Sequence, residues 1–284
     1  MIAIFGTGLL GSGFARALLK RGEQVHVWNR TAAKAKVLEA EGARAFDDPA
    51  EAARDADRVH VVLADDAAVD RTLAAAAPAL AGKLVVDHTT TSTAGARERT
   101  ASWAARGVTY LHAPVFMGPQ NAAESTGLML VSGDRAVLAR AEPLLRPMTG
   151  QLVQLGDRVD AAAAFKLLGN LLLLALGGGF TDMLALGKAM GVAPAEVASL
   201  LDRFNPGSQL PARLKRVVAA EYDQASWTLA MARKDAGLMQ AEADAAGVPL
   251  VALPGIAAQM DAMLARGFRE LDWTVIAKDA LAKR

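Results

Sequence analysis

The sequence predicts an α/β protein in which a doubly wound, mostly parallel sheet is followed by an all-helical second half. An apolar run at residues 2–5 leads directly into the turn Gly6-Thr-Gly8-Leu-Leu-Gly11, and a helix-like stretch at 9–21 follows. Strand-like and helix-like segments then alternate to about residue 155, which is typical of a parallel sheet with helical crossovers. After residue 158 helical patterns dominate, broken by glycine and proline.

Each expected strand is a short apolar run bounded by polar or turn-forming residues. In chain order these runs cover residues 2–5, 24–28, 43–46, 58–63, 83–87, 108–115, 128–132 and 151–155. The expected helices of the first half cover residues 9–21, a stretch from 49, a stretch after 65, and 93–106. One long helix-forming run, 160–190, would begin a second domain and pack beside the first. We therefore predict two domains, 1–158 and 159–284.

The opening turn has the spacing of a phosphate-binding loop. Gly6 would make the tight turn, Gly8 would let the backbone approach a diphosphate, and Gly11 would let the helix pack on the strand. Leu9 and Leu10 open the helix, whose N-terminal amides attract anions. Glycine-rich turns are common, and the alternative is an ordinary strand-to-helix turn. The flanking strand and helix, and the second strand at 24–28, favour dinucleotide binding.

The end of the second strand indicates which dinucleotide is bound. An acidic residue usually stands there in NAD-binding units and takes the ribose hydroxyls. This chain has Asn29-Arg30-Thr31 instead. A guanidinium can bind a 2′-phosphate with paired hydrogen bonds, whereas a carboxylate would repel it. We predict NADP(H) over NAD(H); the alternative is that Arg30 is a surface arginine near a helix start.

Composition excludes several classes of protein. The 31 Lys and Arg residues nearly balance the 30 Asp and Glu residues, so nothing suggests nucleic acid or an acidic membrane surface as partner. The chain has no cysteine, and its four histidines show no metal-ligand spacing, so we expect no metal site. The N-terminus runs straight into a strand, and the apolar run 171–180 is short for a membrane span. We expect a soluble cytoplasmic protein.

A lysine early in the long helix is the best candidate for acid–base chemistry. Lys166 and Asn170 are four residues apart and share a helix face, with apolar neighbours on both sides. Partial burial lowers the pKa of a lysine, which suits a general acid/base near neutrality. The residues alone leave a second interpretation equally open: a lysine that snorkels at a helix end and an amide that caps a loop.

Loops at the carboxyl ends of parallel strands face the ligand crevice, so their residues are further candidates. Thr89 and Thr90, in Asp87-His-Thr-Thr-Thr91, could donate hydrogen bonds there or cap the following helix, and we expect at least one of them to contact a ligand. Leu63 and Ala64 occupy the loop after the fourth strand. Another strand ends in Ala113-Pro-Val-Phe-Met-Gly118, where backbone amides could hold a substrate carboxylate. Lys234-Asp235 could be a surface ion pair or a contribution of the second domain to the cofactor cleft.

Taken together, these residues resemble the β-hydroxyacid dehydrogenase family. That family includes 3-hydroxyisobutyrate dehydrogenase, tartronate semialdehyde reductase and the glyoxylate/succinic semialdehyde reductases. The resemblance covers nearly the whole chain and consists of five motifs in the right order, with Leu10 where methionine is usual. It implies a Rossmann domain followed by an all-α domain.

The resemblance also implies roles for particular residues. Thr90 would contact the cofactor, and Lys234 would lie by its nicotinamide end. Lys166 would be the proton donor and Asn170 the group that orients the substrate. Asn29-Arg30-Thr31 is similar to the NADP-preferring branch of the family.

The substrate loop departs from the family pattern. Family members usually carry Asp-Ala-Pro-Val-Ser-Gly-Gly, whereas this chain has His112-Ala-Pro-Val-Phe116-Met117-Gly118. Two bulky apolar side chains replace a hydroxyl and a flexible glycine. A small, doubly polar acid is therefore less secure as substrate, and the pocket could take a larger or more apolar carbonyl compound. Phe116, Met117 and Gly118 are the expected substrate contacts.

We therefore predict an NADP-dependent oxidoreductase that transfers a hydride between NADP(H) and a small aldehyde, keto acid or 3-hydroxy acid, with Lys166 as general acid/base. An imine reductase, which shares the architecture, is the second interpretation, although such enzymes typically lack the lysine. A non-catalytic NADP-binding interaction module is the third. The apolar second domain predicts a homodimer or higher homo-oligomer, and the family resemblance implies the same.

Overall fold

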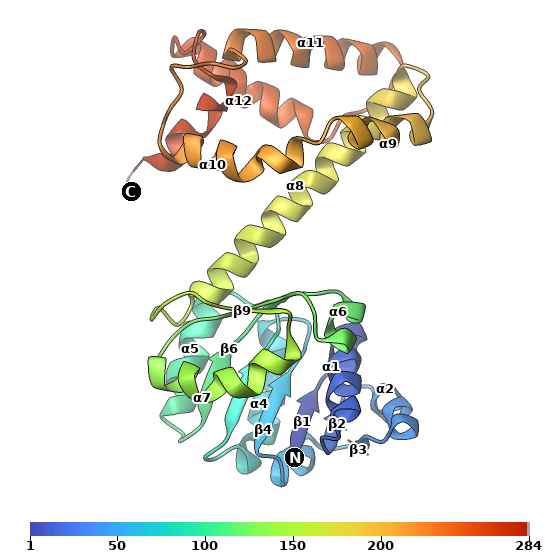
Figure 1. The fold of residues 1–284 in the computed structure, drawn as a ribbon, viewed down its shortest axis with the longest axis vertical. Coiled ribbons are helices and arrows are strands. Elements are labelled where there is room, and N and C mark those ends of the chain that lie inside the picture. The colour runs from blue at the N-terminus through green and yellow to red at the C-terminus, as the bar shows by residue number, and fades with distance from the viewer. Residues whose placement is uncertain (283–284) are drawn as a thin grey trace. The chain divides into compact units, whose positions relative to one another are not determined.

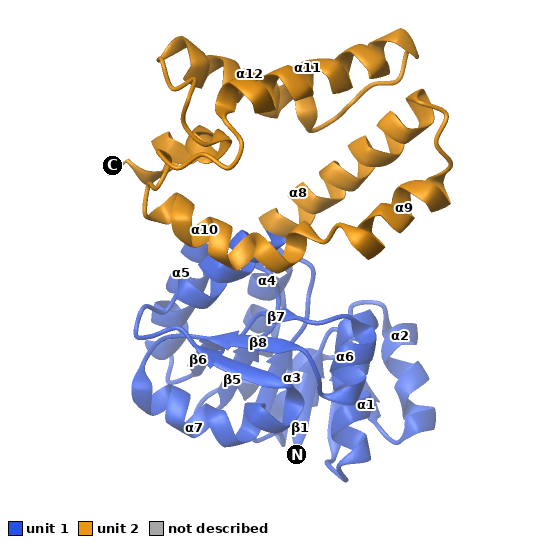
Figure 2. Ribbon diagram, turned by 45° about the horizontal axis from the view of Figure 1, so that its top comes forward, with its two compact units in different colours: residues 1–170 blue, residues 171–284 orange. Residues whose placement is uncertain are grey.

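The computed structural model of the chain describes residues 1–282 (Figure 1). The chain divides into two compact units, Met1–Asn170 and Leu171–Arg284, which Figure 2 shows in different colours. The division falls inside one long helix, α8 (Ala161–Ala189). The boundary that we predict near residue 158 lies just before this helix begins.

Unit 1 is built on a six-stranded parallel sheet with the strand order β3-β2-β1-β4-β5-β6. The strands are β1 (Ile2–Phe5), β2 (Val25–Trp28), β3 (Arg44–Phe46), β4 (Arg58–Val61), β5 (Leu84–Asp87) and β6 (Thr109–His112). The order changes direction between β1 and β4, so the loops that follow these two strands diverge there. Such a switch point is where doubly wound sheets bind their ligands.

Unit 1 contains seven α-helices between its strands. They are α1 (Leu9–Lys20), α2 (Ala32–Lys36), α3 (Pro49–Arg54), α4 (Asp66–Ala76), α5 (Thr93–Ala104), α6 (Pro119–Glu124) and α7 (Arg135–Leu145), with 3₁₀ turns at Val37–Glu41, Ala77–Ala79 and Arg146–Met148. The sequence sets several starts: the side chains of Asp65 and Ser92 accept hydrogen bonds from the amides of Ala68 and Gly95. Each cap satisfies an amide that the first helical turn leaves without a partner.

Both faces of the sheet are buried, which explains why its strands are continuous apolar runs. Successive residues of β1 alternate between two cores. Ile2 and Ile4 pack with Phe14 of α1 in one core, and Phe5 packs with Leu73 of α4 in the other. All four residues of β1 are therefore fully buried.

The expected single strand at 108–115 is wrong: the structure has two strands in two sheets. β6 ends at His112, and β7 (Val115–Phe116) pairs antiparallel with β8 (Leu128–Val131). β8 pairs in parallel with β9 (Gln151–Gln154), giving a separate three-stranded sheet. Pro114 has no amide to continue a ladder, and its carbonyl accepts from the amide of Leu130 in the second sheet. The chain thus changes sheets just before Phe116.

Unit 2 is helical. Besides the end of α8 it contains α9 (Pro194–Arg203), α10 (Leu210–Val218), α11 (Leu229–Ala245) and α12 (Leu253–Ala265), with 3₁₀ turns at Pro206–Gln209 and Trp273–Leu281. Its core includes Leu229 of α11, Met260 and Met263 of α12, and Val275. No strand occurs among its described residues, so the predicted fold class, a doubly wound sheet followed by an all-α region, is confirmed.

Helix α8 is long and apolar enough to cross a membrane, judged by length and composition only. Its most apolar 18-residue window has a mean hydropathy of 1.7, and 17% of that window is buried. One such helix is a weak indication, because core helices of soluble proteins pass the same test. The cytoplasmic location stays a prediction.

Candidate functional site

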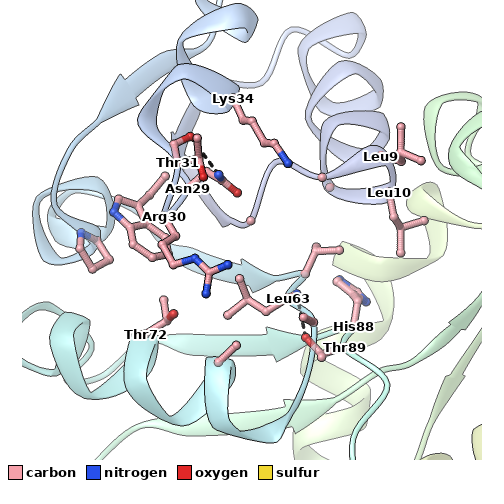
Figure 3. Close-up of a pocket in the computed structure, with 18 of the residues that line it drawn as sticks. Leu9, Leu10, Asn29, Arg30, Thr31, Lys34, Leu63, Thr72, His88 and Thr89 are labelled. Atoms are coloured by element: carbon pink, nitrogen blue, oxygen red, sulfur yellow. Dashed lines mark hydrogen bonds between the residues drawn. The ribbon is translucent and has the colours of Figure 1, made fainter.

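Unit 1 contains a cavity of about 770 Å³ at the switch point of the sheet (Figure 3). It lies where the loops after β1, β2, β4 and β5 converge, and one residue of α8 also reaches it. Of the site residues predicted from sequence, those lining it are Gly6, Gly8, Leu9, Leu10, Gly11, Asn29, Arg30, Thr31, Leu63, Ala64, Thr90, Met117 and Lys166. The order of the strands has gathered residues from positions 6 to 166 around one space.

The glycine turn leaves the start of α1 open to this cavity. Gly6 has a φ of +99°, and a Cβ there would lie 2.1 Å from the carbonyl oxygen of Val62. A Cβ on Gly11 would lie 1.9 Å from the carbonyl oxygen of Gly6, so only glycine lets α1 approach the turn this closely. A Cβ on Gly8, in contrast, would meet nothing within 4 Å. Gly8 is the N-cap of α1 and has no side chain to satisfy the first amides, so they are free for a phosphate.

Asn29 holds the shape of the turn. Its Oδ1 accepts from the amide of Thr7 at 3.1 Å, and its Nδ2 donates to the carbonyl oxygen of Thr31 at 3.0 Å. The end of β2 is thereby tied to the loop after β1. Asn29 lines the cavity and also fixes the relative position of two loops that line it.

The lining of the cavity is rich in positive charge. Arg30, Lys34 and Arg71 line it, and Asp47 is the single carboxylate residue among the lining residues. Figure 3 shows Arg30 and Lys34 extending inward from the end of β2 and from α2. The ion pairs within residues 1–282 involve none of these three cations. Three cations without an ion-pair partner in the lining of one cavity suit a ligand that carries phosphate groups.

Our sequence reasoning missed Arg71. It lies on α4 with Ala68, Thr72 and Ala75, and all four line the cavity. Their spacing is that of one helix face, and the alanines leave room for a ligand. A face of small residues carrying one arginine, on the helix after the fourth strand, is a signal that could have been found in the sequence.

The loop after β5 is fixed around Thr89. Its hydroxyl accepts from the amide of Leu63 at 3.0 Å, and its own amide donates to Asp87 Oδ1 at 2.9 Å. Its carbonyl oxygen lies 2.9 Å from His112 Nε2. Thr89 and Thr90 both line the cavity, but Thr89 is the buried one. Thr90 is exposed, and it is the residue that the family resemblance assigns to the cofactor.

A buried polar network supports this loop from below. The hydroxyl of Tyr110 donates to Asp87 Oδ2 at 2.5 Å and accepts from Arg99 Nε at 3.0 Å. Arg99 also pairs with Asp66 and Asp70 of α4. Burial, together with the charge of Asp87, raises the pKa of Tyr110 well above its ordinary value, so the phenol keeps its proton. The network links α4, α5, β5 and β6 beneath the cavity.

Lys166 reaches the cavity from the second turn of α8. It is 9% exposed, and its Nζ lies 4.1 Å from the ring centroid of Phe116. Burial lowers the pKa of its ammonium below the ordinary 10.5. A lysine with this environment can give up a proton more readily than a surface lysine.

The remaining predicted residues do not line the cavity. Asn170, Phe116 and Gly118 are not among the residues that line the cavity. The amide of Gly118 already donates to Asn121 Oδ1 at 2.9 Å. Lys234 lies in unit 2, half exposed, with its Nζ 2.7 Å from Asp235 Oδ1.

Comparison with known proteins places the chain in a family. Residues 1–156 match the model of the NAD binding domain of 6-phosphogluconate dehydrogenase, and residues 160–279 match that of the NAD-binding domain of NADP-dependent 3-hydroxyisobutyrate dehydrogenase. The 3-hydroxyisobutyrate dehydrogenase of Pseudomonas aeruginosa is 30% identical over 273 residues, with 89% of each chain covered. The NAD-dependent L-serine dehydrogenase of the same organism is 29% identical, with 98% of this chain and 96% of that protein covered.

Solved structures share the whole fold. A reductive aminase from Aspergillus terreus, in complex with NADPH and ethyl levulinate, has a TM-score of 0.91, 27% identity and 98% coverage of both chains. An imine reductase from Myxococcus stipitatus, in complex with NADP+, has a TM-score of 0.92 at 22% identity, with 98% of this chain and 99% of that chain covered. The family matches, the relatives and the cavity agree: the chain belongs to the β-hydroxyacid dehydrogenase family and is an NAD(P)-dependent oxidoreductase.

Proposed function

We propose that the protein is an NADP(H)-dependent reductase of carbonyl compounds, or the reverse dehydrogenase, with Lys166 as its general acid/base. The observation that carries this is one cavity lined by two chemically different kinds of basic side chain. Three cations without an ion-pair partner, Arg30, Lys34 and Arg71, line it, and so does a buried lysine, Lys166. The first suits the 2′-phosphate that distinguishes NADP from NAD, and the second suits proton transfer.

The residues that would hold the cofactor follow from their chemistry. The free amides at the start of α1 suit the diphosphate, and Gly8 leaves room for it. Arg30 and Arg71 can each form paired hydrogen bonds to a phosphate, and Lys34 adds a point charge. When bound, NADPH supplies the hydride for reduction of a carbonyl carbon.

Lys166 would supply the proton that reduction also requires. Its ammonium would donate to the carbonyl oxygen as negative charge develops there, and it would accept the proton back in the reverse direction. Asn170 follows one turn later on the same face of α8, where its amide would orient the substrate. A lowered pKa brings the lysine closer to the pH at which it can serve in both directions.

A cofactor comparison tests the proposal. Purified protein should bind NADPH more tightly than NADH, and it should oxidise NADPH in the presence of some member of a panel of aldehydes and ketones. A clear preference for NADH would contradict the cofactor assignment. Tight NADPH binding without turnover of any carbonyl compound would contradict the reaction.

A second candidate is reduction of carbon–nitrogen double bonds. It is supported by the 27% identity to a reductive aminase crystallised with a neutral keto ester, and by the apolar Phe116-Met117 loop. A cyclic imine assayed beside the carbonyl panel separates the two reactions. Turnover of the imine alone would favour this second candidate.

We also propose that the chain forms a homodimer through its helical part. Leu171, Leu172, Leu173 and Leu174 are consecutive in α8, so they point to all sides of the helix, and each is more than half exposed. A helix that is apolar all round is stable in water only when it is covered. A second copy of the chain, with the same apolar helix, is the partner that we propose.

A further inference from the structure

Phe116 takes the place of an acidic or polar partner for Lys166. The Nζ atom lies 4.1 Å from the centroid of the ring, within the range of a cation–π contact. Burial is the sole cause that lowers the pKa of Lys166, with no charged or hydrogen-bonding partner acting on it. The ammonium is thus held against an aromatic face, which leaves its N–H groups free for a substrate.

Gly169 makes room for that ring. It lies three residues after Lys166 in α8, and a Cβ at this position would lie 2.2 Å from Cζ and 2.7 Å from Cε1 of Phe116. The ring therefore fills the volume that any other residue at 169 would occupy. Glycine inside a helix is less stable than alanine, so this residue destabilises the helix while it leaves space for the ring.

The ring lies behind Lys166 and near any group that its ammonium binds, although Phe116 itself does not line the cavity. An oxygen that accepts a hydrogen bond from Nζ lies about 2.9 Å away, and so no more than about 7 Å from the ring centroid. Val115 and Met117, on either side of Phe116 in sequence, line the cavity with apolar side chains. A substituent next to the reacting carbonyl would therefore meet apolar surface.

In this part of the site a carboxylate would lie beside apolar side chains. The amide of Gly118, an expected donor, is already bonded to Asn121 Oδ1. An acid substrate would bring a second acceptor, its carboxylate, beside these side chains, in addition to the carbonyl that Lys166 binds. A neutral carbonyl compound has one acceptor for this donor and leaves no charge unpaired. An unpaired charge would be costly in an apolar site.

We propose that Phe116 and Gly169 are a matched pair of specificity determinants, which select carbonyl compounds with an uncharged, apolar substituent over those with a carboxylate. The proposal rests on the proposed function, in which Lys166 binds the reacting oxygen. It differs from that function because it concerns which substrate is accepted and not whether a carbonyl is reduced.

Methyl 4-oxobutanoate and 4-oxobutanoate form a matched substrate pair, since they share the reacting aldehyde and the carbon chain and differ in charge. With NADPH, the wild-type protein should show a kcat/KM for the ester that is about tenfold or more above that for the acid, given the cost of an unpaired charge. In Phe116→Ser this ratio should fall by about the same factor. An acid preference in the wild type, or an unchanged ratio in the variant, would overturn the proposal.

A double-mutant cycle tests the pairing without any turnover. Gly169→Ala should lower Tm in the wild-type background, because the new methyl group displaces the ring. In the Phe116→Ser background the same change should raise Tm or leave it unchanged, because the volume is empty and alanine is the better helix former. Equal effects of Gly169→Ala in both backgrounds would show that ring and glycine are not coupled.

Binding of neutral amides gives the second readout that is independent of turnover. Hexanamide should bind to the NADP+-saturated protein more tightly than acetamide, with a gain in affinity of up to roughly three- to fourfold per buried methylene. This gradient of affinity with chain length should be smaller in Phe116→Ser. No gradient in the wild type, or the same gradient in the variant, would overturn the proposal. If neither aldehyde is reduced while the gradient and the Tm pattern hold, the proposed reaction fails and the apolar selection stands.

Discussion

His60 donates a hydrogen bond from Nδ1 to Nε2 of His88 over 2.9 Å, and the two rings are nearly parallel, with an interplanar angle of 6°. The direction follows from their other partners. Arg58 donates from Nε to His60 Nε2, so the proton of His60 must be on Nδ1. His88 accepts it at Nε2 and donates its own Nδ1 proton to the carbonyl oxygen of Ala113 at 2.7 Å. Each ring uses one donor and one acceptor, and both are neutral.

These two buried, neutral histidines predict that the protein loses stability in mild acid. Burial lowers the pKa of His60 well below 6.5, and it lowers the pKa of His88 from 6.5 to about 4. Because the folded-state pKa of His88 is the lower one, the unfolded chain binds the extra proton first. From the size of the pKa shift, His88 contributes about 3 kcal/mol to the free energy of unfolding. This contribution is complete above about pH 6.5 and is lost as the pH falls to about 4. Urea unfolding at a series of pH values measures this slope.

His88→Asn separates this histidine from the other titrating groups. Asparagine keeps a donor for the carbonyl of Ala113 and cannot take up a proton. The variant should be less stable than the wild type at pH 7.5, and its free energy of unfolding should depend less steeply on pH between 6.5 and 4. The same slope in both proteins would show that His88 is not responsible.

Substitution of Lys166 should separate binding from chemistry. Lys166→Ala should lower kcat by roughly two to four orders of magnitude while the Kd for NADPH stays near its wild-type value, since general acid catalysis contributes about that much. Lys166→Arg keeps the charge but does not release a proton, so it should be nearly as slow. In the wild type, the rate of carbonyl reduction should fall as the pH rises through the lowered pKa of Lys166. Near-normal turnover in the alanine variant would refute the assignment.

The extent to which the sequence predicts this site depends on how local each interaction is. The glycine turn is predictable because its cause, a positive φ at Gly6 followed by a helix start, lies within six residues. Arg30 is predictable because it stands at a fixed place after a strand. Lys166 is predictable as a costly residue in an apolar helix, and the family resemblance adds its role.

Other parts depend on tertiary contacts that no local pattern reports. The ring of Phe116 meets Gly169, which lies 53 residues later in the sequence, and the exchange of sheets at Pro114 brings them together. Arg71 and Arg30 line the same cavity because the helix after β4 and the loop after β2 meet at the switch point of the sheet, not because of spacing in the sequence. The expected single strand 108–115 is wrong because Pro114 has no amide to continue the ladder of the first sheet.

The cationic group should determine the choice of cofactor. Arg30→Ala and Arg71→Ala should each raise the Kd for NADPH by roughly tenfold to a hundredfold, the value of a charged hydrogen bond, and leave the Kd for NADH nearly unchanged. Lys36→Ala is the matched control, since Lys36 lies at the end of α2 and does not line the cavity. Fluorescence titration measures all of these constants. Equal weakening of both cofactors would argue against a 2′-phosphate contact.

The hydroxyl of Tyr110 should contribute more to the free energy of unfolding than the hydroxyl of Tyr222 in unit 2. Tyr110→Phe would leave Asp87 Oδ2 and Arg99 Nε without the partner between them, in a buried place, so we expect a loss of about 1–3 kcal/mol in the free energy of unfolding. Tyr222 is the other tyrosine, and its hydroxyl makes one long bond, 3.3 Å, to the carbonyl of Val217. Tyr222→Phe should change stability by much less. Urea unfolding of the two variants compares them, and equal losses would show that the network beneath the cavity is not special.

The apolar surface of α8 predicts the assembly state. Leu174 is 74% exposed in the single chain, although it lies in a run of four leucines that point to all sides of the helix. A second copy that covers this run would bury them, and Leu174→Glu would then place a charge in the interface, which is unfavourable without a partner. Light scattering should find a dimer for the wild type and a monomer, or a much weaker dimer, for the variant. Val37→Glu is the matched control, because Val37 is 62% exposed in unit 1, outside the helical part. A monomeric wild type at working concentration would remove the dimer proposal, and a dimer that survives Leu174→Glu unchanged would place the interface elsewhere.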